Sequence, residues 1–247
     1  MSRANLLFDA NFPSASYILG GVLIDAEAGY WQSLTGVILA EQGLEVRQLY
    51  SERDDRVLFA DLCFTLNAGD VLQIAGPNGS GKTSLLRILA GLSSRYEGDI
   101  FWQSHSLDQQ RAAYLEQLLY IGHGAGIKAA LSPLENLRWS CALRGLKQSD
   151  ETIFQALTKV GLQGFEQQPC YSLSAGQQRR VNLARLFCIP AQLWILDEPF
   201  TAIDQRGVAE IELWISDFAN AGGAVLLTTH HPLAMQRPLR VIDLGAF

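Results

Sequence analysis

Val71-Leu-Gln-Ile-Ala75 runs directly into Gly76-Pro-Asn-Gly-Ser-Gly-Lys-Thr83, and Ser84-Leu-Leu-Arg-Ile-Leu-Ala90 follows without a break. The first stretch is a short apolar run typical of a buried strand, and the third has helical periodicity. A glycine-rich turn between a strand and a helix, ending in Gly-Lys-Thr, fits the P-loop pattern. The sequence therefore predicts a phosphate-binding loop at the carboxyl end of a core strand.

Each residue type in this loop has a chemical reason to be there. Glycines let backbone N–H groups turn inward around phosphate oxygens, and the helix N-terminus adds a partial positive charge. We expect Lys82 to reach the β- and γ-phosphates of ATP and the Thr83 hydroxyl to bind Mg²⁺. The nucleotide-binding residues predicted here are Gly76, Pro77, Asn78, Gly79, Ser80, Gly81, Lys82, Thr83 and Ser84.

A second apolar strand ends in two acids. Leu193-Trp-Ile-Leu196 is followed by Asp197 and Glu198, which fits a Walker B strand. Ligands bind at the carboxyl edge of an open α/β sheet, so both acids should lie beside the P-loop. We expect Asp197 to hold Mg²⁺ through water and Glu198 to polarise the attacking water. The alternative, an ordinary strand with surface acids, is less favoured because a P-loop lies upstream.

A third motif narrows the class. Leu173-Ser174-Ala175-Gly176-Gln177 heads a predicted helix and resembles the LSGGQ signature of ABC ATPases. The Ser174 hydroxyl and the open backbone of small residues at a helix N-terminus form a second phosphate-binding surface. The resemblance implies that Ser174, Gly176 and Gln177 contact ATP held by a second subunit, in a homodimer. The plainer interpretation is that Ser174 only caps its helix.

Other segments resemble the same family in the expected order. Pro199 to Asp204 resembles the D-loop, and Thr228-Thr-His230 resembles the segment whose histidine contacts the γ-phosphate. His123 stands where most members have a glutamine that joins the core to the helical lobe; we include it among the nucleotide-site residues. For the adenine-stacking aromatic the sequence offers Arg53 or Tyr50, because a guanidinium can also stack on a purine.

Several variants of these motifs resemble one branch, the cytochrome c biogenesis ATP-binding export family of haem exporter ATPases. The resemblance covers about residues 44 to 244 and implies a peripheral subunit at the cytoplasmic face of a bacterial inner membrane. It also implies an integral-membrane permease and haem-handling membrane partners. No haem motif accompanies it. The segments that carry it are 44–59, 64–69, 121–123, 126–128, 173–180, 193–204, 228–230 and Pro232-Leu233.

The alternation of strand and helix signals predicts an α/β cassette with a mainly parallel core sheet, an antiparallel β part and a helical lobe. We assign the core to 44–105 and 190–247, and the helical lobe to about 106–189. Ser132 with Glu135, Ser149, Ser174 and Asp204 are the predicted helix N-caps. Residues 1–43 form an N-terminal extension without a motif. These residues are either dispensable, in which case they need not be translated at all, or they form an accessory helix.

Composition limits the alternatives. The net charge of −6 argues against a general nucleic-acid binder, and no apolar run reaches the ~20 residues of a membrane span. Four cysteines without a CxxC pair are typical of reduced thiols. Two other function classes stay open at this point: a soluble ABC protein of translation or DNA repair, and a P-loop kinase or other nucleotidase.

Overall fold

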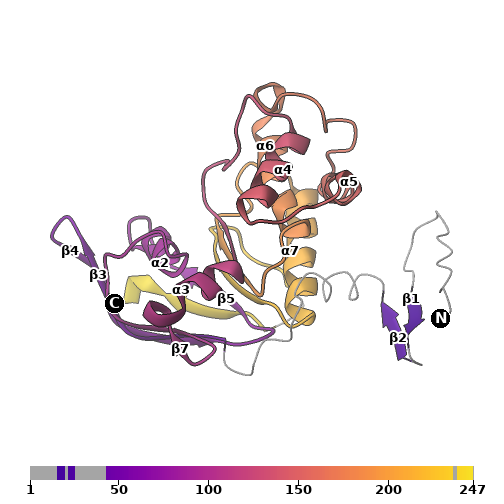
Figure 1. Ribbon diagram of the computed structural model, residues 1–247. Coiled ribbons are helices and arrows are strands. Elements are labelled where there is room, and N and C mark those ends of the chain that lie inside the picture. The colour runs from indigo at the N-terminus through magenta and orange to yellow at the C-terminus, as the bar shows by residue number, and fades with distance from the viewer. Residues whose placement is uncertain (1–15, 20–21, 26–42, 236–237, 247) are drawn as a thin grey trace.

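The computed structural model describes residues 16–19, 22–25, 43–235 and 238–246 (Figure 1). Most of the N-terminal extension therefore lies outside the described residues. Its described parts are β1 (Ser16–Leu19) and β2 (Val22–Asp25), which pair antiparallel with each other. Four residues are too few for a strand pattern to show in the sequence, and these described parts are strands and not the accessory helix that one alternative named.

A parallel sheet of five strands forms the centre of the cassette, in the order β11-β5-β10-β9-β8. Residues of β9 and β10 are buried along their whole length because both faces of the sheet are covered. In β9, Trp194 and Leu196 face one hydrophobic cluster while Leu193 and Ile195 face the other. The strands are β5 (Val71–Ala75), β8 (Leu118–Ile121), β9 (Leu193–Asp197), β10 (Ala224–Thr228) and β11 (Arg240–Asp243).

An antiparallel sheet in the order β4-β3-β6-β7 supplies the predicted antiparallel part. A tight turn at Asp54 and Asp55, both with positive φ, joins β3 to β4, as short hairpins require. Helix α2 (Lys82–Leu89) buries its apolar residues in the hydrophobic cluster that this sheet shares with β5. The strands are β3 (Leu44–Arg53), β4 (Arg56–Leu66), β6 (Glu97–Trp102) and β7 (His105–Ser106).

The predicted helix starts are confirmed. Ser132 and Glu135 form a capping box, and Ser149, Ser174 and Asp204 also cap their helices. The helices besides α2 are α3 (Leu107–Glu116), α4 (Pro133–Leu143), α5 (Asp150–Lys159), α6 (Ala175–Leu183) and α7 (Gln205–Asn220). Short 3-10 helices are η1 (Cys170–Ser172), η2 (Ala184–Phe187) and η3 (Leu244–Ala246). The helix that Ser174 caps thus tightens into η2 in its last turn.

Helices α4, α5 and α6 lie together in a lobe to one side of the two sheets (Figure 1). The predicted start of this lobe at about residue 106 is too early. Helix α3 contacts β6 and β7, and β8 pairs with β9 in the parallel sheet. We therefore place the start of the lobe after Ile121; the rest of the division into core and lobe stays a prediction.

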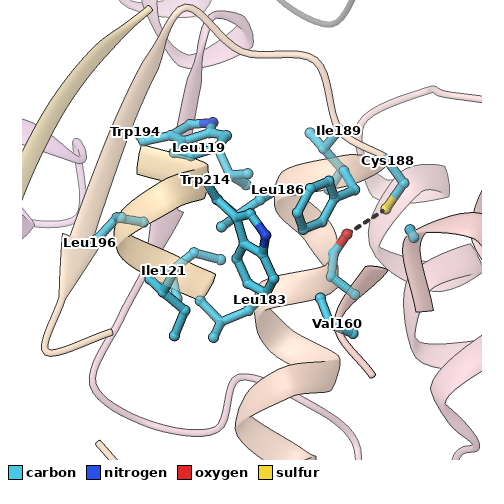
Figure 2. Close-up of a cluster of buried hydrophobic side chains, with 14 of the residues drawn as sticks. Leu119, Ile121, Val160, Leu183, Leu186, Cys188, Ile189, Trp194, Leu196 and Trp214 are labelled. Carbon is cyan, nitrogen blue, oxygen red and sulfur yellow. Dashed lines mark hydrogen bonds between the residues drawn. The ribbon is translucent and has the colours of Figure 1, made fainter. Parts of the chain in front are cut away.

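The lobe and the parallel sheet share one hydrophobic core (Figure 2). Leu183 of α6 lies in this cluster with Ile121 of β8 and Leu196 of β9. The Trp194 ring stacks on Phe218 of α7 with centroids 3.7 Å apart. This shared packing ties α6 to the strands that carry the site residues.

All four cysteines are free thiols, as expected. Among the described residues, no helix combines the length and apolar character that crossing a bilayer requires. The predicted α/β fold, with a parallel sheet, an antiparallel sheet and helices, is confirmed.

Candidate nucleotide site

Four neighbouring parallel strands end at one edge of the sheet, and each is followed by predicted site residues. Strand β5 leads into Gly76, β8 into His123, β9 ends at Asp197, and β10 leads into His230. In the register of the sheet, Thr228 pairs with Asp197 on one side and Ile74 on the other. Topology therefore brings together motifs that are far apart in the sequence.

The loop from Gly76 to Thr83 joins β5 to α2. Gly76, Gly79 and Gly81 all have positive φ, at 136°, 82° and 96°. A Cβ on Gly81 would lie 2.9 Å from Leu58 Cβ, and one on Gly76 would lie 2.6 Å from Ser80 Oγ. Both the backbone conformation and the close approach thus require glycine at these positions.

Lys82 points back into the loop that precedes it. Its Nζ donates to the carbonyl oxygens of Gly76 at 2.7 Å and Pro77 at 3.0 Å. The Ser80 Oγ is buried and has no hydrogen-bond partner among the described residues. A buried donor without an acceptor is costly, so the loop favours a ligand that brings oxygen atoms.

The Asp197 carboxylate lies beside the Thr83 hydroxyl. Its Oδ1 accepts hydrogen bonds from Thr228 Oγ1 at 2.7 Å and Thr83 Oγ1 at 3.3 Å. Its Oδ2 is buried and has no hydrogen-bond partner among the described residues. Mg²⁺ prefers hard oxygen ligands from one or two carboxylates together with substrate phosphates. These oxygen atoms fit the metal that the sequence predicted, which Thr83 and Asp197 would contact.

Glu198 adopts a left-handed backbone conformation, with φ of 51°. Its N–H donates to the Thr228 carbonyl oxygen at 3.2 Å and to Thr228 Oγ1 at 3.1 Å. Its carboxylate accepts from the His230 N–H at 3.3 Å and lies 3.5 Å from His230 Nε2. In this conformation the Glu198 carboxylate contacts His230.

These groups line one cavity of 570 Å³, together with Arg53 and His123. Of the two adenine-stacking candidates, Arg53 lines this cavity. Tyr50 does not, and its hydroxyl donates to Glu52 at 2.8 Å. The lining residues are Arg53, Leu58, Asn78, Gly79, Gly81, Lys82, Thr83, Ser84, His123, Asp197, Glu198, Thr201 and His230.

The signature residues lie elsewhere. Ser174 Oγ accepts from the Gln177 N–H at 3.2 Å, and Gln177 Oε1 accepts from the Ser174 N–H at 2.9 Å, so both serve as caps of α6. A Cβ on Gly176 would lie 2.6 Å from the Ala202 carbonyl oxygen. Within the described residues, none of the three lines the P-loop cavity of its own chain. Gly176 lies instead beside Ala202, in the segment that resembles the D-loop.

Two polar residues of the site were missed from the sequence. Thr228 ends an apolar strand, and its buried hydroxyl holds both Asp197 and the Glu198 backbone. Arg179 lies on α6 and donates to backbone carbonyls of Asp197 and Glu198. A polar residue at the end of a buried strand is a usable signal, but nothing local distinguishes Arg179 from the neighbouring Arg180.

One titratable group beside the site is strongly perturbed. Burial raises the pKa of Tyr120 to about 12, and the nearby Asp197 carboxylate adds to the rise. Tyr120 therefore stays a neutral phenol at physiological pH.

A P-loop, a strand ending in Asp-Glu and a signature helix on this two-sheet fold define an ATP-binding cassette ATPase. The family description "ABC transporter" matches residues 59–201. "Cytochrome c biogenesis ATP-binding export protein CcmA" of Hahella chejuensis is 53% identical over 203 residues, covering 82% of this chain and 96% of that protein. The protein of the same name from Pseudomonas fluorescens is 54% identical with the same coverage.

Solved structures agree in fold. A putative ABC transporter ATP-binding protein from Pyrococcus furiosus superposes with a TM-score of 0.71 at 24% identity, covering 83% of this chain and 98% of that chain. A dimeric ATP-binding cassette in a post-hydrolysis state, bound to ADP and Pi, gives 0.72 at 19% identity, covering 82% and 95%.

The chain belongs to the ABC transporter family and, within it, to the family of cytochrome c biogenesis ATP-binding export proteins. It is an ATP-binding, ATP-hydrolysing subunit of an ABC transporter, a family whose ATPase subunits act as dimers with membrane components. This family assignment disagrees with the two alternatives, a kinase and a soluble ABC protein of translation or repair.

Proposed function

We propose that the chain drives haem export or release of a haem-loaded chaperone in cytochrome c biogenesis. It works as a homodimer on an integral-membrane permease with haem-handling partners, peripherally at the cytoplasmic face of a bacterial inner membrane. The observation that carries this proposal is the name shared by relatives of about half-identical sequence, which this chain matches over nearly their whole length.

One half of each ATP site comes from the P-loop side. The backbone of Gly76 to Gly81 and the Lys82 ammonium bind the phosphates, and Ser84 lines the same cavity. Thr83 and Asp197 hold Mg²⁺, which supplies charge neutralisation on the phosphates. Arg53 supports the adenine, because it lines this cavity and Tyr50 does not.

Hydrolysis needs a group that polarises the attacking water. Glu198 fits this role because its carboxylate lines the cavity and is only 18% exposed. His230 lies 3.5 Å from that carboxylate. We expect its ring to contact the γ-phosphate of bound ATP. His123 follows the neighbouring strand β8 and lines the same cavity. Its ring is suited to contact water there, beside the helical lobe.

The second half of each site comes from the other subunit. Ser174, Gly176 and Gln177 lie outside the cavity of their own chain, although they form a helix N-terminus suited to phosphate. Across a two-fold axis, the same surface on each subunit can close the partner's nucleotide site. ATP is then enclosed between two chains, and turnover depends on the dimer.

Complementation tests the haem branch. The chain is expressed in a bacterium that lacks its own ATPase subunit for cytochrome c maturation, and covalent haem in c-type cytochromes is measured by staining. We expect the parent chain to restore the cytochromes and Glu198→Gln, present at the same level on the membrane, to fail. Failure of a membrane-bound, ATP-hydrolysing parent chain contradicts the haem assignment.

A further inference from the structure

The Arg179 guanidinium is buried at the junction of the helical lobe and the nucleotide site, with the residue only 4% exposed. Its Nε donates to the Pro199 carbonyl oxygen at 3.3 Å. Its Nη1 donates to Gly122 O at 2.8 Å and Gly124 O at 3.5 Å. Its Nη2 donates to Asp197 O at 3.1 Å and Glu198 O at 2.8 Å. An arginine has five N–H donors, and here each has one backbone acceptor.

These acceptors belong to the two loops that carry His123 and Glu198. Gly122 and Gly124 flank His123, and the other three carbonyls belong to Glu198 and its neighbours on either side. Both segments are irregular loops after strands, and Glu198 has the left-handed φ of 51°. A non-glycine residue in that region needs surrounding structure to hold it, and the Arg179 fork supplies much of that structure.

The electrostatics agree with this arrangement. Burial lowers the pKa of Arg179 from its ordinary value, while the charges of Asp197 and Glu198 oppose that effect. The guanidinium contacts backbone oxygens of these residues, so both carboxylates stay available to the cavity. The arginine therefore holds the loops without neutralising the acids by direct pairing.

Arg179 lies on α6, five residues after Ser174, and α6 begins at the signature motif. We propose that Arg179 is a positioning residue that fixes Glu198 and His123 in place relative to the signature helix of the same chain. Movement of the signature when it meets the partner's ATP is then transmitted to the chain's own hydrolytic site. This inference rests on the proposed composite sites.

Arg179→Lys in the full chain tests it, because an ammonium has three donors and cannot span both loops. We expect kcat for ATP to fall roughly 10- to 100-fold with KM within about twofold, since small misplacement of a catalytic group costs on that order. Arg144→Lys is the matched control. Arg144 also donates to backbone carbonyls, of Leu115 and Leu118, but away from the site, so its kcat should stay within about twofold.

A double variant separates positioning from general loosening. If Arg179 acts through Glu198, adding Arg179→Lys to Glu198→Gln should lower the residual single-turnover rate by less than about threefold. An equal loss in both backgrounds, or an unchanged kcat in Arg179→Lys alone, overturns the inference. A parent chain that hydrolyses ATP fully as a monomer instead overturns the composite-site proposal, and this inference with it.

Discussion

Replacing Glu198 by glutamine tests the assignment of the water-polarising group most directly. Glutamine keeps the size of the side chain and an oxygen that can accept from the His230 N–H, now at 3.3 Å. It removes only the negative charge beside the cavity. Losing a general base costs roughly 10²- to 10⁴-fold in rate, or about 3–5 kcal/mol of transition-state stabilisation.

The same contacts predict little effect on folding. The Glu198 backbone keeps its bonds to Thr228 and Arg179, so the melting temperature should change by no more than about 2 °C. ATP binding should also persist, because Lys82 and the P-loop are untouched. The variant should therefore accumulate as an ATP-bound dimer.

Two measurements check this prediction: phosphate release at saturating ATP, and molar mass by light scattering with and without ATP. Glu212→Gln on α7 is a suitable control, because its carboxylate accepts from the Ala234 N–H at 2.9 Å and does not line the cavity. Its turnover should match the parent. Turnover of Glu198→Gln within about threefold of the parent would refute the role of Glu198.

Four further predictions follow from the same geometry. Lys82→Ala should lose nucleotide binding itself, measured by titration with a fluorescent ATP analogue, because it removes the charge held between Gly76 and Pro77; binding at parental affinity contradicts this. Ser174→Arg should block hydrolysis while sparing analogue binding to the monomer. The missing helix cap should lower the free energy of unfolding by about 1 kcal/mol. His123→Gln should keep most basal turnover and weaken stimulation by the membrane partner, so a collapse of basal turnover would make His123 directly catalytic. Leu183→Ala, in the core shared by α6 and β9, should lower the free energy of unfolding by about 2–5 kcal/mol and the melting temperature by roughly 5–15 °C.

Most of the cassette could be predicted from local patterns. The strand from Val71 to Ala75, the capping box at Ser132 and the Asp204 cap depend on neighbouring residues only, and the structure has all three. Strand β8 was harder, because four residues after a short helix carry too little periodicity to separate them from the lobe. Its place in the sheet depends on pairing with β9, far along the chain.

For the site, motif order predicted which side chains gather at the sheet edge but not how they are held. The sequence by itself determined the phosphate loop and the acid pair, because glycines, a lysine and adjacent carboxylates at set spacing impose their own local chemistry. Only the tertiary structure decided that Arg53 and not Tyr50 lines the cavity, and that Arg179 joins the loops of His123 and Glu198. Such contacts arise where strand ends and helices from distant segments meet, and no local pattern records them.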